Sequence, residues 1–171
     1  HIKGDAVSEA YSGKYNLMIA HPPCTYLSNA GACRMYPTAG NIDMDRYKKA
    51  MNAREFFMLM LSAPIKHIAI ENPVPLSIAN LPLSAQEIQP FQFGSPYSKK
   101  TLLWLKNLPI LMPTKTLKSY SPFIASGTSK NKGKKIGQKF ADGSKQRSKT
   151  FPGIAKEMAV QWGKVLLDED F

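Results

Sequence analysis

Two residues of this sequence have side chains that suit covalent catalysis, and each follows an apolar segment. Cys24 comes directly after His21-Pro22-Pro23, and Glu71 is followed by Asn72 and Pro73. A thiolate is a nucleophile and a carboxyl group can give or take a proton, so the two together could activate an unsaturated substrate. An isolated cysteine is more often an inert buried side chain, and Glu-Asn-Pro alone could simply form a turn. The elements that carry these residues therefore decide whether they form a site.

The segments around both residues predict a strand, a helix and a second strand. Residues 15–20 form a short apolar run that the following prolines end, because proline lacks a backbone donor. Residues 43–61 have apolar side chains at helical spacing, with Asp43 placed to cap the first turn. Residues 66–70 alternate and are rich in β-branched side chains, which predicts a second strand ending at Glu71-Asn72-Pro73. Such a βαβ unit brings both strand ends to one edge of a parallel sheet, where open α/β sheets bind ligands.

The rest of the chain completes the prediction of one α/β domain over residues 1–171. Residues 101–105 predict a further strand of the same sheet, and residues 150–166 predict an amphipathic helix with Pro152 in its first turn. Residues 118–149 are rich in Lys, Gly and Ser, which favours a flexible basic insertion. Trp104 and Trp162 are expected in the core. His21 and His67 lack the spacing of metal ligands, so no metal site is predicted.

The net charge of +11 is concentrated in one segment. Residues 99–149 contain thirteen Lys or Arg and a single acid, Asp142, whereas the remainder is close to neutral. A basic surface of this size attracts polyanions, so nucleic acid is the expected partner; a solvated tail without a ligand is the alternative. The two cysteines predict neither a zinc site nor a disulfide framework, and no membrane-spanning run or secretory leader is evident. We therefore expect a soluble, cytoplasmic protein without a membrane or metal partner.

The longer text around Cys24 resembles a catalytic motif of the DNA cytosine-5 methyltransferases, Pro-Cys-Gln-x-Phe-Ser-x-Ala-Gly. That text reads Pro22-Pro23-Cys24-Thr25-Tyr26-Leu27-Ser28-Asn29-Ala30-Gly31, and Glu71-Asn72-Pro73 is similar to the family's Glu-Asn-Val motif. Three further segments resemble the family in the expected order: His1-Ile2-Lys3-Gly4-Asp5, Phe93-Gly94-Ser95-Pro96-Tyr97-Ser98-Lys99-Lys100-Thr101 and Thr150-Phe151-Pro152-Gly153-Ile154-Ala155-Lys156. Thr25 replaces the usual Gln, and Thr101 stands at the family's second Arg. The compact form is similar to small methyltransferase-like proteins of phages and prophages.

The resemblance implies a Rossmann-like sheet that binds S-adenosylmethionine and methylates carbon 5 of cytosine in DNA, within a restriction-modification setting in a bacterial or phage-infected cell. Cys24 would add to carbon 6 of the cytosine while Glu71 donates a hydrogen bond or proton to ring nitrogen 3. The base must leave the duplex, and Asn72 and Lys99 would help to hold it. The cofactor-binding residues that the resemblance implies are Asp5, Pro22 and Pro152. The expected DNA-binding residues are Ser28, Lys99 and Lys100, together with those of the basic segment: Lys130, Lys132, Lys134, Lys135 and Arg147.

The family's glycine-rich cofactor loop and ribose-binding acid would lie upstream of Asp5, and this sequence contains neither. We therefore expect that an N-terminal segment before His1, or a partner chain, completes the cofactor site. A chain that begins at His1 is expected not to bind S-adenosylmethionine measurably. A catalytically silent relative that binds nucleic acid, as an interaction or decoy protein, is the alternative. An amino methyltransferase is disfavoured, because that chemistry stacks the base on an aromatic residue where Cys24 stands.

Overall fold

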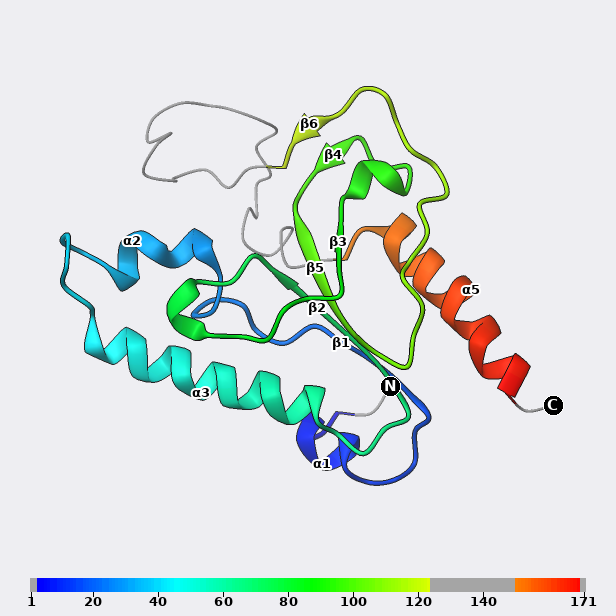
Figure 1. Cartoon of the computed structure of the whole chain (residues 1–171), viewed down its shortest axis with the longest axis horizontal. Coiled ribbons are helices and arrows are strands. Elements are labelled where there is room, and N and C mark those ends of the chain that lie inside the picture. Colours follow the sequence, from blue (N-terminus) through cyan, green and yellow to red (C-terminus); the bar gives the residue numbers. More distant parts are fainter. Residues whose placement is uncertain (1–2, 124–149, 170–171) are drawn as a thin grey trace. The chain divides into compact units, whose positions relative to one another are not determined.

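The computed structural model of the protein describes residues 3–123 and 150–169 (Figure 1). These residues form a mixed α/β fold that divides into two compact units. Unit 1 comprises the described residues up to 87 together with residues 101–110, and unit 2 comprises residues 88–100 with the described residues from 111 onward. None of the described helices is long and apolar enough to cross a membrane.

The centre of unit 1 is the βαβ arrangement that the sequence predicts. Strand β1 (Leu17–Ala20) pairs in parallel with β2 (His67–Pro73), and the long helix α3 (Met44–Leu61) connects them (Figure 1). Helix α3 begins where expected, because the Asp43 carboxylate accepts the backbone N–H of Arg46 at 2.9 Å. The parallel pair therefore directs the ends of β1 and β2 toward the same edge of the sheet.

Strand β2 extends three residues further than its apolar pattern indicates. Strand β5 (Thr101–Lys106) runs antiparallel beside it and pairs Glu71 with Leu103, Asn72 with Leu102 and Pro73 with Thr101. The strand ends at the expected triplet Glu71-Asn72-Pro73, but the triplet itself belongs to the strand, because the neighbouring strand supplies partners that keep these residues extended. With β3 (Gln86–Ile88) the sheet has the order β1-β2-β5-β3, a mixed sheet.

Shorter helices and two apolar clusters complete unit 1. The helices are α1 (Ala6–Ala10), η1 (Asn29–Gly31), α2 (Ala32–Met35) and η2 (Ser77–Ala79). The larger cluster joins α3 to the sheet and includes Phe57, whose ring meets Trp104 edge-on at 5.0 Å between centroids. Trp104 is buried as expected, and its Nε1–H donates to the carbonyl of Pro82. The smaller cluster packs Met35, Ala50 and Leu76 together.

Unit 2 contains the C-terminal helix that the sequence predicts, α5 (Pro152–Glu169), with Trp162 fully buried. A larger side chain cannot replace Gly153 in its first turn, because a Cβ there would overlap the backbone carbonyl of Phe93. The side chain of Gln161 both donates to and accepts from the backbone of Met112, which fixes the helix to the preceding loop.

The start of the predicted basic loop is more ordered than its composition indicates. Within the expected loop 118–149, β6 (Ser121–Pro122) pairs in parallel with β4 (Tyr97–Ser98), next to η3 (Pro90–Gln92). The partner strand β4 is distant in the sequence, so the local composition of residues 118–149 cannot reveal this pairing. Residues 124–149 lie outside the described part of the chain.

Candidate active site

The ends of β1 and β2 bring His21 and Glu71 together. Ala20 and Ile70 are the last partners in the parallel register, so the next residue of each chain segment lies at the same sheet edge. His21 Nδ1 lies 2.9 Å from Glu71 Oε2, with side-chain exposures of 39% and 15% respectively. A half-buried carboxyl group held by an imidazole is an arrangement that can orient an acid toward a substrate.

Asn72 connects β2 directly to the segment that carries Cys24. Its Nδ2 donates to the carbonyl of Pro22 at 3.0 Å, and the residue is only 1% exposed. Its Oδ1 is buried and has no hydrogen-bond partner among the described residues. Side chains alternate between the faces of a strand, so Asn72 and Glu71 leave β2 in opposite directions. Asn72 therefore fixes the preceding loop, while Glu71 can face a ligand.

Cys24 begins a tight turn that is anchored on both sides. Its carbonyl accepts the backbone N–H groups of Leu27 and Ser28 at 3.1 and 2.9 Å, and Leu27 is fully buried. The Leu27 carbonyl in turn accepts the N–H of Leu76 at 2.7 Å, just beyond β2. Cys24 itself is half-buried, whereas Cys33 is exposed, and both thiols are free. The fold therefore holds the Cys24 backbone firmly and leaves its side chain partly accessible.

Arg46 also contacts this turn, and the sequence analysis did not single it out. From the first turn of α3 its Nη2 donates to the carbonyl of Thr25 at 2.8 Å, and its guanidinium lies 5.1 Å from the centre of the Tyr26 ring. This contact joins residues 21 positions apart in the chain, so no local sequence pattern marks it.

His21 is a second residue of the site to which the sequence analysis gave no catalytic role. The order of the elements did offer a signal. The parallel register ends at Ala20 and Ile70, so the next residues along the chain, His21 and Glu71, lie side by side. Among the residues that the structure describes, no group of three or more His, Cys, Asp or Glu side chains could hold a metal ion.

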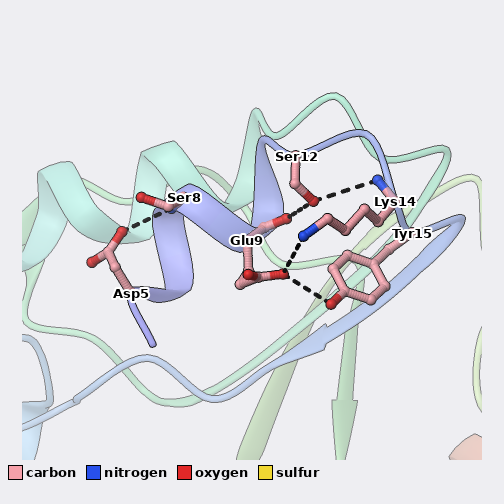
Figure 2. Close-up of polar contacts among 6 residues, drawn as sticks. All are labelled: Asp5, Ser8, Glu9, Ser12, Lys14 and Tyr15. Carbon is pink, nitrogen blue, oxygen red and sulfur yellow. Dashed lines mark hydrogen bonds and ion pairs between the residues drawn. The ribbon is translucent and has the colours of Figure 1, made fainter. Parts of the chain in front are cut away.

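A pocket of about 470 Å³ runs along β1 beside the His21 end of the strand. Apolar side chains of α3 and of the segment before β2 form much of its wall, and Glu9, Tyr15 and Pro22 also line it. The Glu9 carboxylate accepts the Tyr15 hydroxyl at 2.9 Å and lies 3.7 Å from Lys14 Nζ, as Figure 2 shows. This carboxylate raises the pKa of Tyr15, because ionising the phenol would break the bond and place two negative charges together.

Asp5, which the resemblance assigns to the cofactor, caps helix α1. Its carboxylate accepts the backbone N–H of Ser8 at 2.7 Å (Figure 2). That hydrogen bond lowers the pKa of Asp5, because it favours the charged form. Pro22, also assigned to the cofactor, is buried and lines the pocket. Pro152, the third residue of that set, is the first residue of α5 in unit 2.

The residues expected to contact DNA are distributed over both units. Ser28 is 7% exposed in unit 1, where it forms a bridge with Pro75. Lys99 and Lys100 belong to unit 2, and Lys99 Nζ lies 5.8 Å from the centre of the Phe151 ring. The others lie outside the described residues: Lys130, Lys132, Lys134, Lys135 and Arg147.

A scan of this chain against protein-family models and a search of curated proteins both give no match.

Proposed function

We propose that this chain carries the catalytic residues of a methyltransferase that modifies carbon 5 of cytosine in DNA, with S-adenosylmethionine as methyl donor. The observation that carries the proposal is the arrangement at the ends of β1 and β2. There His21 contacts Glu71, and Asn72 binds the carbonyl two residues before Cys24. A nucleophile after β1 and an acid in the adjacent parallel strand β2 form the constellation that covalent activation of a base requires.

The fold that we propose is a Rossmann-like methyltransferase sheet. The parallel unit β1-α3-β2 is the building block of such sheets. The antiparallel strand β5 is compatible with this fold, because many α/β sheets carry an antiparallel strand on a parallel core.

In the proposed reaction the Cys24 thiolate forms a bond to carbon 6 of a cytosine that has been flipped out of the helix. Glu71 donates a proton to ring nitrogen 3, so the electron pair of the 5,6 double bond makes carbon 5 nucleophilic. After carbon 5 has accepted the methyl group, a water molecule acting as base would take the proton on carbon 5, the electron pair of that C–H bond would re-form the 5,6 double bond and expel the Cys24 thiolate, and the proton on ring nitrogen 3 would return to Glu71. The complete cycle, but no single step before the last, returns Cys24 and Glu71 to their starting states.

The neighbours of Glu71 support its role as the acid. The contact of His21 at 2.9 Å is with Oε2 of Glu71, and we assign the other carboxyl oxygen, Oε1, to the base. We assign Asn72 a positioning role in place of direct contact with the base. Its Nδ2 already binds the Pro22 carbonyl, and its side chain is buried.

The pocket along β1 fits part of the proposed methyl donor. Its volume of about 470 Å³ lies in the range of small-molecule sites, and its apolar wall includes Phe56, Met60 and Ile65. Such a wall suits an adenine ring, and the Glu9 carboxylate offers an acceptor for hydroxyl or amino groups. When bound, S-adenosylmethionine supplies an electrophilic methyl group to the activated carbon.

Covalent trapping tests the proposal. DNA that contains 5-fluorocytosine should form a stable adduct with the full-length protein, tested together with any segment or partner that completes the cofactor site, when S-adenosylmethionine is present. The adduct is stable because fluorine at carbon 5 cannot be eliminated as a proton is. Cys24→Ser should abolish the adduct, and Cys33→Ser is the matched control that should retain it. An adduct that survives in Cys24→Ser refutes the assignment of the nucleophile. DNA binding without any adduct in the wild-type protein would instead favour the catalytically silent relative.

A further inference from the structure

A second hollow of unit 1, of about 530 Å³, borders the turn that carries Cys24. It lies between this turn and the beginnings of α2 and α3, and we call it the Tyr26 hollow. The residues that the argument uses are Tyr26, Arg34, Asp43, Asp45, Arg46 and Lys49. None of them belongs to the catalytic pair or to the pocket along β1.

Three cations of the Tyr26 hollow lack a carboxylate partner within the described part of the chain. Arg46 and Lys49 both approach the Tyr26 ring, at 5.1 and 5.8 Å from its centre, and Arg34 is exposed. The ion pairs of Lys14 with Glu9 and of His21 with Glu71 do not involve these cations. The positive charge of the hollow is therefore available to an external anion.

The two acids of the hollow do not neutralise these cations by direct contact. The Asp43 carboxylate is occupied as the N-cap of α3, where it accepts the backbone N–H of Arg46. Asp45 is exposed in the first turn of the same helix and makes no ion pair with a described residue. The Tyr26 hollow thus has three cationic and two acidic side chains, and one of the acids is engaged by the helix N-terminus. The hollow therefore carries an excess of positive charge.

We propose that the Tyr26 hollow binds a backbone phosphate of the nucleic acid whose base reaches Cys24. This inference rests on the proposed function and names a contact for its substrate. Arg and Lys side chains provide the donors that phosphate oxygens accept, and such contacts fix the register of a nucleic acid on a protein. Arg46 joins the two sites, because the same guanidinium lines the hollow and holds the Thr25 carbonyl. A phosphate bound there would therefore lie directly beside the turn that presents the nucleophile.

Salt-dependent binding tests this inference. The affinity of the whole chain for a fluorescent duplex oligonucleotide is measured by anisotropy at several salt concentrations, without cofactor, for Arg34→Gln, Lys49→Gln and the double variant. Each lost duplex contact should reduce the slope of log affinity against log salt by about 0.9, and the double variant should bind on the order of tenfold or more weakly at 0.1 M salt. Lys48→Gln is the matched control, because Lys48 is an exposed neighbour on α3 that does not line the hollow.

Lys49→Arg keeps the charge and should keep the wild-type slope, which separates a charge effect from an effect on folding. Equal slopes for wild type and the double variant would overturn the inference. An equal loss of affinity in Lys48→Gln and Lys49→Gln would also overturn the inference, since such a loss would reflect net charge alone. Trapping by 5-fluorocytosine distinguishes the two proposals. An adduct with an unchanged slope refutes the Tyr26 hollow alone, whereas a reduced slope without an adduct in the wild-type protein refutes the catalytic proposal alone.

Discussion

Replacement of Asn72 by alanine tests whether this side chain fixes the segment that leads to Cys24. The substitution removes the 3.0 Å hydrogen bond to the Pro22 carbonyl, and a buried acceptor left without its donor costs about 1–3 kcal/mol. It also removes Oδ1, a buried acceptor without a described partner, and this gain offsets part of the cost. The void left by the amide group is a further cost. Together, these effects should lower the free energy of unfolding by about 1–2 kcal/mol.

Asn72→Asp gives a sharper result because its effect depends on pH. A carboxylate at this 1% exposed position cannot donate to Pro22, and burial opposes its charge. The pKa of the new carboxyl group should therefore be higher in the folded than in the unfolded protein. With that sign, the variant is closest to wild type below the unfolded pKa of about 4, and its stability falls as the pH rises through the folded pKa. At pH 7 we expect a loss of about 3 kcal/mol or more.

Urea denaturation of wild type and both variants at pH 4 and pH 7 measures these differences. Asn41→Ala serves as the control, because Asn41 is exposed and its amide reaches only the Thr38 hydroxyl at 3.4 Å. The reasoning is refuted if Asn72→Ala matches the control, or if the deficit of Asn72→Asp relative to wild type is the same at both pH values.

Three further predictions concern packing and ionisation. Gly153→Ala should destabilise the fold by about 1–3 kcal/mol in urea, because its Cβ meets a backbone carbonyl, whereas Gly163→Ala in the same helix has open space and should add about 0.5–1 kcal/mol. Glu9→Gln should lower the raised pKa of Tyr15, so phenolate absorbance should appear at lower pH. In wild type the free energy of unfolding falls as the pH rises through the Tyr15 pKa, and this fall should be smaller in the variant. Leu27→Ala, at a fully buried position, should cost about 2–5 kcal/mol in the same urea assay.

The sequence by itself determined the elements that depend on neighbouring residues. Helix α3 begins at the Asp43 cap and β1 stops before two prolines, as local hydrogen bonding and backbone geometry require. The order of these elements was sufficient to predict a parallel pair with Cys24 after its first strand, whereas Glu71 lies inside the second strand, one residue beyond the parallel register. The proposed chemistry of the site stays a prediction that rests on these residues.

Tertiary structure decided the contacts between residues far apart in the chain. Strand β5 turned the expected end of β2 into a longer strand, because its backbone groups pair with Glu71, Asn72 and Pro73. The bonds from His21 to Glu71 and from Arg46 to Thr25 span 50 and 21 positions, so they depend on strand register and helix packing. A local pattern fixes which residues can form a helix or strand, but only the packed chain determines which side chains meet, because register and packing are set by the whole core.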